Sequence, residues 1–360
     1  MERVEALQAS MHEHGTDLVV VGPTSSMRYL TGYRPMAVER ITVLLVTHDA
    51  VAMIMPYFDV DEFKEATGLD AVFEWADKQG PSEAIEQAFR SLGLSTDPIV
   101  AAVDDELRFD FLTQLRERLA DQPRRASELL APLRLSKTTK EQACIRRAGH
   151  LVARNRCCIP ARPTRDDGTR VERTIENTLW DQGAESVDFV LVQAGANSAL
   201  GHHNADETEL RKGEPVLIDI AARVDGYFAD VTQQIFFGRP PHNYKEAYEI
   251  VARAQEEGIR AAHSGASASD VDRAAMAVIE TAGFGKWNGP RTGHGIGLDV
   301  HEPPSVIGGD ETELVPGAVI TIEPGVYMPG KFGIRIEDTV IVTDGGPQRV
   351  TRGARPLFSK

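Results

Sequence analysis

The sequence predicts an α+β protein of two domains, with a smaller α/β domain ahead of a larger α+β one. The length of 360 residues is enough for two domains that each bury a core. The first third alternates amphipathic helical segments with short apolar runs, as in α/β layers, whereas the remainder combines long helices with β-hairpins. A polar connector at 136–139 carries a helix-capping signal, so we expect the domains to cover residues 1–133 and 134–360.

In the first domain, helices are expected where apolar residues recur at helical spacing, and strands where short apolar runs occur. This part of the chain contains no motif of catalytic type. The expected strands are 17–21, 42–47, 50–55 and 99–103, and the expected helices are 2–14, 82–91 and 109–120. After the boundary, the expected helices are 140–155, 171–182, 243–262 and 268–282.

The composition excludes several classes of protein. A formal net charge of -15 and an isoelectric point near 5.2 would repel a polyanion, so we expect no nucleic-acid partner. The polar start of the chain and the lack of any run of about 18 apolar residues predict neither a secretory leader nor a membrane span. The 3 cysteines form no disulfide framework or CxxC pattern, so we expect reduced thiols and a cytoplasmic location.

The most informative segment is a predicted β-hairpin with an Asp-Gly pair at 225–226. This pair lies between two β-rich runs, which is a strong signal for a two-residue turn. The turn fixes the register and places Asp219 opposite Thr232. By the same register Asp230 lies opposite Ala221, so both aspartates share one face as diagonal neighbours, roughly 7 to 8 Å apart. That spacing suits two carboxylates that converge on metal ions about 3.5 to 4 Å from each other.

A second hairpin is expected over 321–342, with its turn at 329–331. Glu323 and Glu337 are then directly opposed. In the returning strand, isoleucines alternate with Arg335 and Glu337, so one face packs in the core while an arginine and a carboxylate share the other. An arginine beside acidic ligands can orient one of them or hold a substrate carboxylate.

A glycine-rich segment lies between the two hairpins. His294 is flanked by glycines at 293, 295 and 297, which let the backbone come close to a ligand. His301 follows seven residues later. By itself, a Gly-His-Gly segment is equally well explained as a structural turn.

Together these segments offer four carboxylates and one imidazole for metal binding. This oxygen-dominated set favours Mn²⁺, Co²⁺ or Fe²⁺ and admits Zn²⁺. Four clustered carboxylates carry four negative charges, which two divalent cations would neutralise. The set therefore predicts two divalent metal ions, with Mn²⁺ as the first choice. The expected ligands are Asp219, Asp230, His294, Glu323 and Glu337.

These five residues, with the motifs GHGIG, TIEPG and IRIED around the last three, resemble the metal ligands of the pita-bread metallopeptidases. That family comprises Xaa-Pro aminopeptidase, Xaa-Pro dipeptidase (prolidase), methionine aminopeptidase and the metal-free creatinase. The resemblance covers nearly the whole chain, because SSMRYLTGYR looks like part of the creatinase-type N-terminal domain, which methionine aminopeptidases lack. It implies a pita-bread catalytic domain behind a creatinase-like α/β domain.

The resemblance implies hydrolysis of the Xaa-Pro amide bond, in dipeptides or at the N-terminus of short peptides, by a water molecule that bridges the two ions. Glu323 would take the proton of that water. His202, in SALGHH, and His301, in VHEPP, match family histidines that bind substrate and stabilise the intermediate. Arg335 would orient ligands or a substrate terminus. Two-domain members of the family are often dimers, so a homodimer is expected.

Some positions depart from the family pattern. Ala221, Gln233 and Gly201 stand where Gly, Arg and Pro are common; they flank ligands and so affect pocket shape more than metal binding. Ser305 stands four residues after His301, where archaeal-type dipeptidases resemble one another in having an Arg that grips the dipeptide carboxylate. We therefore do not expect strict dipeptidase specificity.

Other polar side chains of the second domain are expected to have structural roles. On an extended segment His202 and His203 point to opposite sides, so His203 is expected to be a spacer or a residue that supports the site without touching the substrate. Tyr227 and Tyr327 are expected to be packing residues.

Two other functions fit the same scaffold. One is a non-peptide amide or ring hydrolase, either creatinase-like or ectoine-type. The other is a metal-free interaction module. The five intact ligands argue against the creatinase-like and metal-free versions.

Overall fold

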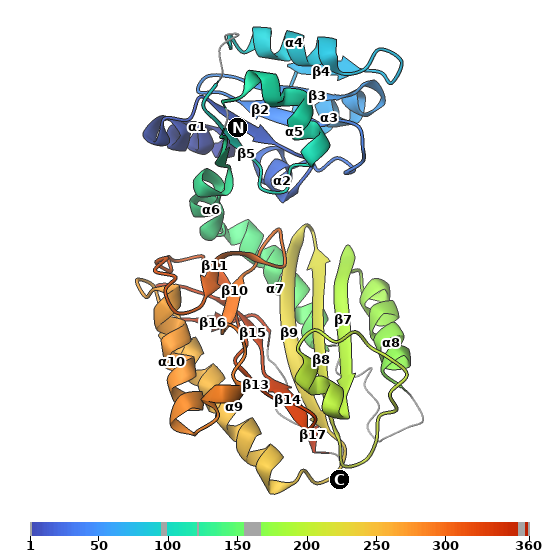
Figure 1. Cartoon of the computed structure of the whole chain (residues 1–360), viewed down its shortest axis with the longest axis vertical. Helices are drawn as coiled ribbons and strands as arrows, with labels where there is room; N and C mark the ends of the chain where they lie inside the picture. Colours follow the sequence, from blue (N-terminus) through green and yellow to red (C-terminus); the bar gives the residue numbers. More distant parts are fainter. Residues whose placement is uncertain (1, 95–98, 121, 155–166, 352–356, 359–360) are drawn as a thin grey trace. The chain divides into compact units, whose positions relative to one another are not determined.

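The computed structural model describes residues 2–94, 99–120, 122–154, 167–351 and 357–358 (Figure 1). The chain divides into two compact units, Met1–Arg134 and Leu135–Lys360. Cys144 is a free thiol, and the other two cysteines lie outside the described residues. None of the described helices is long and apolar enough to span a membrane.

The first unit is built on a six-stranded mixed sheet. Its strands are β1 (Leu18–Val21), β2 (Val43–Val46), β3 (Val51–Pro56), β4 (Val72–Trp75), β5 (Ala101–Val103) and β6 (Arg124–Arg125). Its helices are α1 (Glu2–His14), α2 (Ser25–Thr31), α3 (Val60–Thr67), α4 (Ser82–Ser91), α5 (Phe109–Leu115) and α6 (Ser127–Leu135), the last of which ends at the second unit. The strand order is β4-β3-β2-β1-β5-β6, and apolar side chains of the strands, α4 and α5 form one core.

One half of the second unit is a four-stranded sheet covered by two helices. Its strands are β7 (Ser186–Ala194), β8 (Pro215–Val224), β9 (Tyr227–Phe236) and β17 (Leu357–Phe358), in the order β17-β9-β8-β7. The helices α7 (Thr139–Arg154) and α8 (Gly168–Asp181) pack against one face of this sheet, where the apolar side chains form a core. The other face is therefore left for polar side chains.

The other half combines a five-stranded sheet, a hairpin and two long helices. The sheet has the order β11-β10-β12-β15-β16. These strands are β10 (Gly293–Gly295), β11 (Glu302–Val306), β12 (Val319–Ile322), β15 (Asp338–Ile341) and β16 (Gln348–Arg349); the hairpin is β13 (Gly325–Met328) with β14 (Phe332–Arg335), and the helices are α9 (His242–Ala261) and α10 (Ala268–Thr281). In Figure 1, α9 and α10 flank these strands on the side away from β7–β9. The unit thus has strands inside and helices outside, as the pita-bread expectation requires.

The predicted register of the first hairpin is confirmed. Asp225 and Gly226 form the turn with φ values of 49° and 91°, the left-handed region that a two-residue turn of this type needs. Asp219 pairs with Thr232. Asp230 pairs with Ala221.

The second hairpin departs from the prediction at one place. Ile322 pairs with Asp338 and Gly325 pairs with Arg335, so the register is the expected one, but neither ladder includes Glu323 or Glu337. The residue after Glu323 is a proline, which has no N–H for the ladder. The backbone N–H groups of Glu323 and Glu337 donate instead to carbonyls of the glycine-rich segment and of β9. At the interruption, the hairpin is therefore hydrogen-bonded to the glycine-rich segment on one side and to β9 on the other.

Most expected elements are confirmed, with ends that differ by up to three residues. The helix expected over 109–120 is shorter, because α5 ends at Leu115 and one 3-10 turn, Arg116–Arg118, follows. The sequence prediction missed α2 and α3. These helices have seven and eight residues and end at glycines with φ of 80° and 68°, so they are too short for apolar periodicity to mark them.

Candidate metal centre

The β8–β9 hairpin places two carboxylates side by side on one face of its sheet. The register puts the side chains of Asp219 and Asp230 on the same face, as diagonal neighbours. Their strand neighbours alternate to the other face and enter the core beneath α7 and α8. Asp219 and Asp230 are only 5% and 2% exposed, so water does not solvate these carboxylates as it would at a surface.

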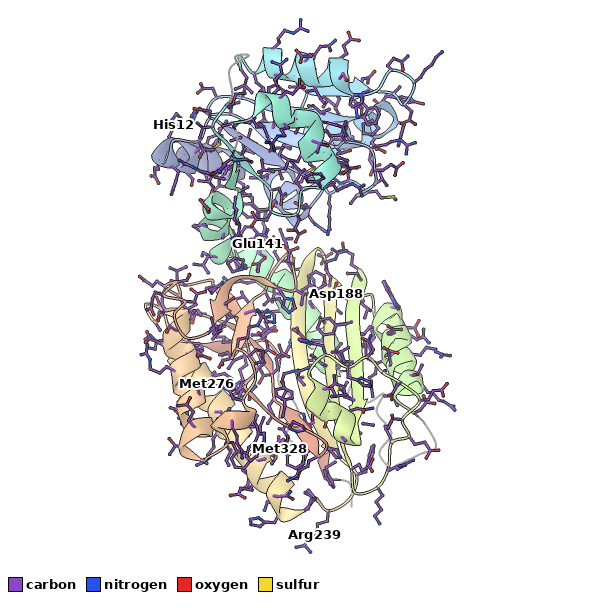
Figure 2. The ribbon with its side chains drawn as sticks, in the orientation of Figure 1. His12, Glu141, Asp188, Arg239, Met276 and Met328 are labelled. Carbon is purple, nitrogen blue, oxygen red and sulfur yellow. The ribbon has the colours of Figure 1, made fainter. Side chains whose placement is uncertain are left out.

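Three further side chains join this pair from the glycine-rich segment and the second hairpin. Ligand atoms of Asp230, His294 and Glu337 all lie within 4.8 Å of one another. Glu323 Oε1 lies 3.4 Å from His294 Nε2. Side chains of the β7–β9 sheet and of the facing strands fill the space between them in Figure 2.

Thr232 connects Asp219 to this group. The Thr232 hydroxyl lies 3.0 Å from Asp219 Oδ1 and 2.6 Å from Glu337 Oε2. Arg335 Nε donates to the same hydroxyl oxygen over 3.0 Å. The structure therefore brings all five predicted ligands into one buried site. The sequence prediction does not include Thr232 in the site, although its pairing with Asp219 puts both side chains on the same face.

The imidazole of His294 has the tautomer that a metal ligand needs. Nδ1 lies 3.0 Å from the carbonyl oxygen of Gly295, which can only accept a hydrogen bond, so Nδ1 carries the proton. The lone pair is then on Nε2, the atom that faces Glu323. Histidines that bind metals are commonly fixed by such a bond from the other ring nitrogen.

The glycines around His294 serve the packing of strands. A Cβ on Gly293 would lie 2.0 Å from Thr321 O, and one on Gly295 would lie 2.4 Å from Pro303 O. The close approach that these two glycines allow is to neighbouring backbone. They let β10 lie close to the backbone on both sides, which fixes the position of His294 between them.

Arg335 is inserted among the carboxylates. Its Nη2 donates to Asp219 Oδ2 over 2.5 Å, and its Nε lies 3.9 Å from Glu323 Oε2. Nη1 donates to the hydroxyl oxygen of Tyr327 over 2.8 Å. Tyr327 therefore has a polar contact in addition to its packing. The signal was present in the register, because Gly325 pairs with Arg335 and Tyr327 shares the face of Gly325.

The charge balance of the site fits divalent cations. Burial raises the pKa of Asp230 and of Glu337, and the neighbouring carboxylates raise both further. Burial also raises the pKa of Glu323. Asp230 Oδ1 and Glu337 Oε1 are buried and have no hydrogen-bond partner among the described residues. Four carboxylates and one guanidinium leave an excess of negative charge that cations would balance.

His301, one of the two other predicted histidines, lies beside the candidate ligand His294. The rings of His294 and His301 are 4.3 Å apart in an edge-to-face arrangement. His301 is exposed in part, yet desolvation of its ring lowers its pKa to about 4, and the neighbouring His294, Arg291 and His202 add to this effect. His202 is exposed, whereas His203 Nε2 lies 3.1 Å from Asp206 Oδ2. His301 is therefore a neutral imidazole at neutral pH.

A fold with helices outside two facing sets of strands, and five converging candidate metal ligands between them, defines a metal-dependent hydrolase of the pita-bread class. The chain belongs to metallopeptidase family M24, whose model matches residues 143–344. The model of the creatinase/prolidase N-terminal domain matches residues 3–136. The predicted resemblance and fold class are thereby confirmed.

Relatives match over the full length. The chain is 33% identical to the probable dipeptidase PepE of Mycobacterium tuberculosis, over 99% of this chain and 95% of that protein. It is 30% identical to a Xaa-Pro dipeptidase of Pyrococcus horikoshii, over 99% of both. Among solved structures, dipeptidase PepE from Mycobacterium ulcerans gives a TM-score of 0.92 at 32% identity, covering 99% of this chain and 96% of that one. The Xaa-Pro dipeptidase from Bacillus anthracis gives 0.89 at 29% identity, covering 99% of both.

Proposed function

We propose that this protein hydrolyses the Xaa-Pro amide bond, in dipeptides or at the N-terminus of short peptides, with the help of two divalent metal ions. The observation that carries the proposal is the convergence of five candidate ligands on one site, four of them buried and Glu323 partly exposed. Full-length similarity to proteins named Xaa-Pro dipeptidase supports the substrate class. The non-peptide hydrolases and the metal-free module gain no support from the site.

The metal ligands would be the five residues predicted from the sequence. The carboxylate-rich set suits Mn²⁺ first, and Co²⁺, Fe²⁺ or Zn²⁺ as well. Bound cations would supply Lewis acidity, which lowers the pKa of water and polarises the scissile carbonyl. The ligands are Asp219, Asp230, His294, Glu323 and Glu337.

The remaining chemistry is assigned to side chains at the open side of the centre. The Glu323 side chain is 18% exposed, against 7% for Asp219 and 3% for His294, so Glu323 is the ligand best placed to accept a proton from the attacking water. His301 and His202 would donate hydrogen bonds to the oxyanion or the leaving nitrogen. Arg335 would hold Asp219 in place.

Ser305 favours acceptance of peptides longer than two residues. It pairs with His294 in the β10–β11 ladder, so its side chain lies on the same face as that ligand. The backbone N–H of Ser305 donates to Asp310 Oδ2 over 2.9 Å. A serine and a nearby carboxylate offer no positive charge to the C-terminus of a dipeptide, and we therefore include aminopeptidase activity in the proposal.

We also propose a domain boundary between residues 133 and 134, a cytoplasmic location and a homodimer. The boundary is supported by the N-terminal family match, which ends at residue 136. The location rests on the expected reduced thiols. The dimer rests on the family resemblance, and light scattering of the purified protein tests it.

The test of function is a hydrolysis panel. Purified protein is assayed with Ala-Pro, Ala-Pro-Ala and an ectoine-type amide, each with Mn²⁺, with Co²⁺ and with chelator. We expect hydrolysis of the proline substrates only, and none with chelator. Asp230→Asn should abolish turnover. Asp225→Asn is the matched control, because it removes the same charge from the turn of the same hairpin, where asparagine tolerates the positive φ. Hydrolysis of the amide alone would replace the proposal by the non-peptide alternative.

A further inference from the structure

Gln193 lies on β7, on the face of the sheet that carries Asp219. In the β7–β8 ladder Gln193 pairs with Leu217, two residues from Asp219 along β8. Its strand neighbours Val192 and Ala194 belong to the core on the other face. The Gln193 side chain is fully buried. A buried amide in this position needs hydrogen-bond partners.

The amide holds the loop that carries His202. Gln193 Nε2 donates to Gly201 O over 2.8 Å and to His203 O over 3.0 Å. Carbonyl oxygens cannot donate, so the nitrogen of the amide must be the atom that faces them. Both amide protons are thus used. The two hydrogen bonds therefore hold the loop at Gly201 and at His203, on either side of His202.

The segment before this loop is anchored separately. The 3-10 helix η4 (Gly195–Leu200) follows β7 directly. Gly333 N donates to Ser198 Oγ over 2.8 Å, and a Cβ on Gly333 would lie 1.9 Å from Ser198 O. This close approach fixes η4 on β14. It does not reach the residues that follow η4.

The residues after η4 lack regular structure. Gly201 has φ of 68° and ψ of −83°, a conformation rarely adopted by other residues. Its carbonyl oxygen also lies 3.5 Å from Arg335 Nη1, a long contact from the ligand network. Among the described residues, the short bonds that fix the carbonyls flanking His202 come from Gln193.

We propose that Gln193 is a positioning residue that sets the direction of the His202 side chain at the metal centre. The inference rests on the proposed function, which gives His202 its role in binding substrate. Without the two bonds, the carbonyls on either side of His202 would lose their fixed positions. A small displacement of a group that must meet the reacting atoms lowers the rate strongly.

The first experiment is a double-mutant cycle on kcat/KM for Ala-Pro. Gln193→Met keeps the length of the side chain and removes both donors. We expect a loss of about tenfold with His202 present and of less than about twofold in a His202→Ala background. Gln233→Met is the control: the ladder pairs Gln233 with the core residue Ile218, so Gln233 lies on the core face and does not shape the pocket as the sequence suggested, and kcat/KM should stay within about twofold.

A second measurement does not depend on activity. Metal-free protein with ¹³C-labelled histidine gives one ring signal for His202, assigned as the signal missing from His202→Ala. We expect Gln193→Met to shift or broaden that signal and Gln233→Met to leave it unchanged.

The outcomes separate this inference from the proposed function. An equal loss in both backgrounds of the cycle, or full activity of His202→Ala, would overturn the positioning role. Wild-type protein without Xaa-Pro hydrolysis would refute the proposed function, and the ring signal then decides the inference. A His202 signal unchanged in Gln193→Met would overturn it.

Discussion

Ser305→Arg should convert the protein towards strict dipeptidase behaviour. Ser305 is paired with His294 across the β10–β11 ladder, and directly paired side chains have Cβ atoms about 4.5 to 5.5 Å apart. An arginine at this position would therefore extend beside the metal centre on the side where His301 lies. There its guanidinium would meet the free carboxylate of a bound dipeptide.

The size of the effect follows from the degree of burial at Ser305. A hydrogen bond to a charged group contributes about 1.5 to 3 kcal/mol, which corresponds to about one to two decades in kcat/KM. Ser305 is partly exposed, and Asp310 would compete for the new charge, so the lower end applies. We therefore expect the ratio of kcat/KM for Ala-Pro to that for Ala-Pro-Ala to rise about tenfold.

The assay compares the two substrates under one metal and salt condition. Ser305→Met controls for the size of the new side chain without its charge, and should leave the ratio close to that of the unmodified protein. The unmodified protein should show little preference between the substrates. A tenfold or greater preference for Ala-Pro in the unmodified protein would refute the reasoning, and so would an equal change in the arginine and methionine variants.

The remaining predictions concern the metal and its surroundings. Elemental analysis should find up to two divalent ions per chain, and activity of metal-free protein would contradict the site. Chelation should lower the melting temperature more at about pH 8 than at about pH 6. The raised pKa values of the buried carboxyls let the folded metal-free protein hold protons, and the metal-free fold becomes less stable as these protons are lost with rising pH. An equal shift of the melting temperature at both pH values, measured by calorimetry, would contradict this. Glu323→Gln should keep the fold and lower kcat about 10²-fold to 10⁴-fold. Glu311 is exposed, and Glu311→Gln should leave kcat unchanged. Near-normal turnover of Glu323→Gln would show that another residue is the base. Arg335→Met should lower the free energy of unfolding of metal-free protein by about 3 to 5 kcal/mol, because Asp219 loses a buried partner; urea denaturation that shows less than about 1 kcal/mol would contradict this.

Local signals in the sequence were enough to predict which acidic side chains share one face. The Asp-Gly pair at 225–226 admits the positive φ values of a tight turn, and that turn alone determines which face Asp219 and Asp230 share. The turn at 329–331 likewise determines the register of the second hairpin, but it does not predict the break in the ladder at Glu323 and Glu337. A one-residue change of register would have moved either aspartate to the core face.

What the sequence could not supply were contacts between elements distant along the chain. Tyr327 and Arg335 share a face by register, but the convergence of Arg335 on Asp219 depends on how two hairpins pack. Gln193 is similar, because an apolar strand with one amide does not reveal which carbonyls the amide meets. The three hydrogen-bond partners of Thr232 come from β8 and from the second hairpin. Local periodicity does not predict contacts between segments that lie so far apart in the sequence.

The hydroxyl of Thr232 explains why cation binding and proton release should be linked. It has one proton, yet it lies within hydrogen-bond distance of Asp219 and Glu337 while it accepts from Arg335. The hydroxyl can donate its one proton to Asp219 or to Glu337, but not to both at once. At the carboxyl that does not receive this proton, two oxygen atoms face each other. That contact is favourable only if this carboxyl is itself protonated, or if a bound cation attracts both oxygens. Burial and the neighbouring carboxylates raise the pKa of Glu337, which favours a proton on Glu337 in metal-free protein. A divalent cation would displace that proton, and metal affinity should therefore increase with pH over the range in which the metal-free fold loses stability.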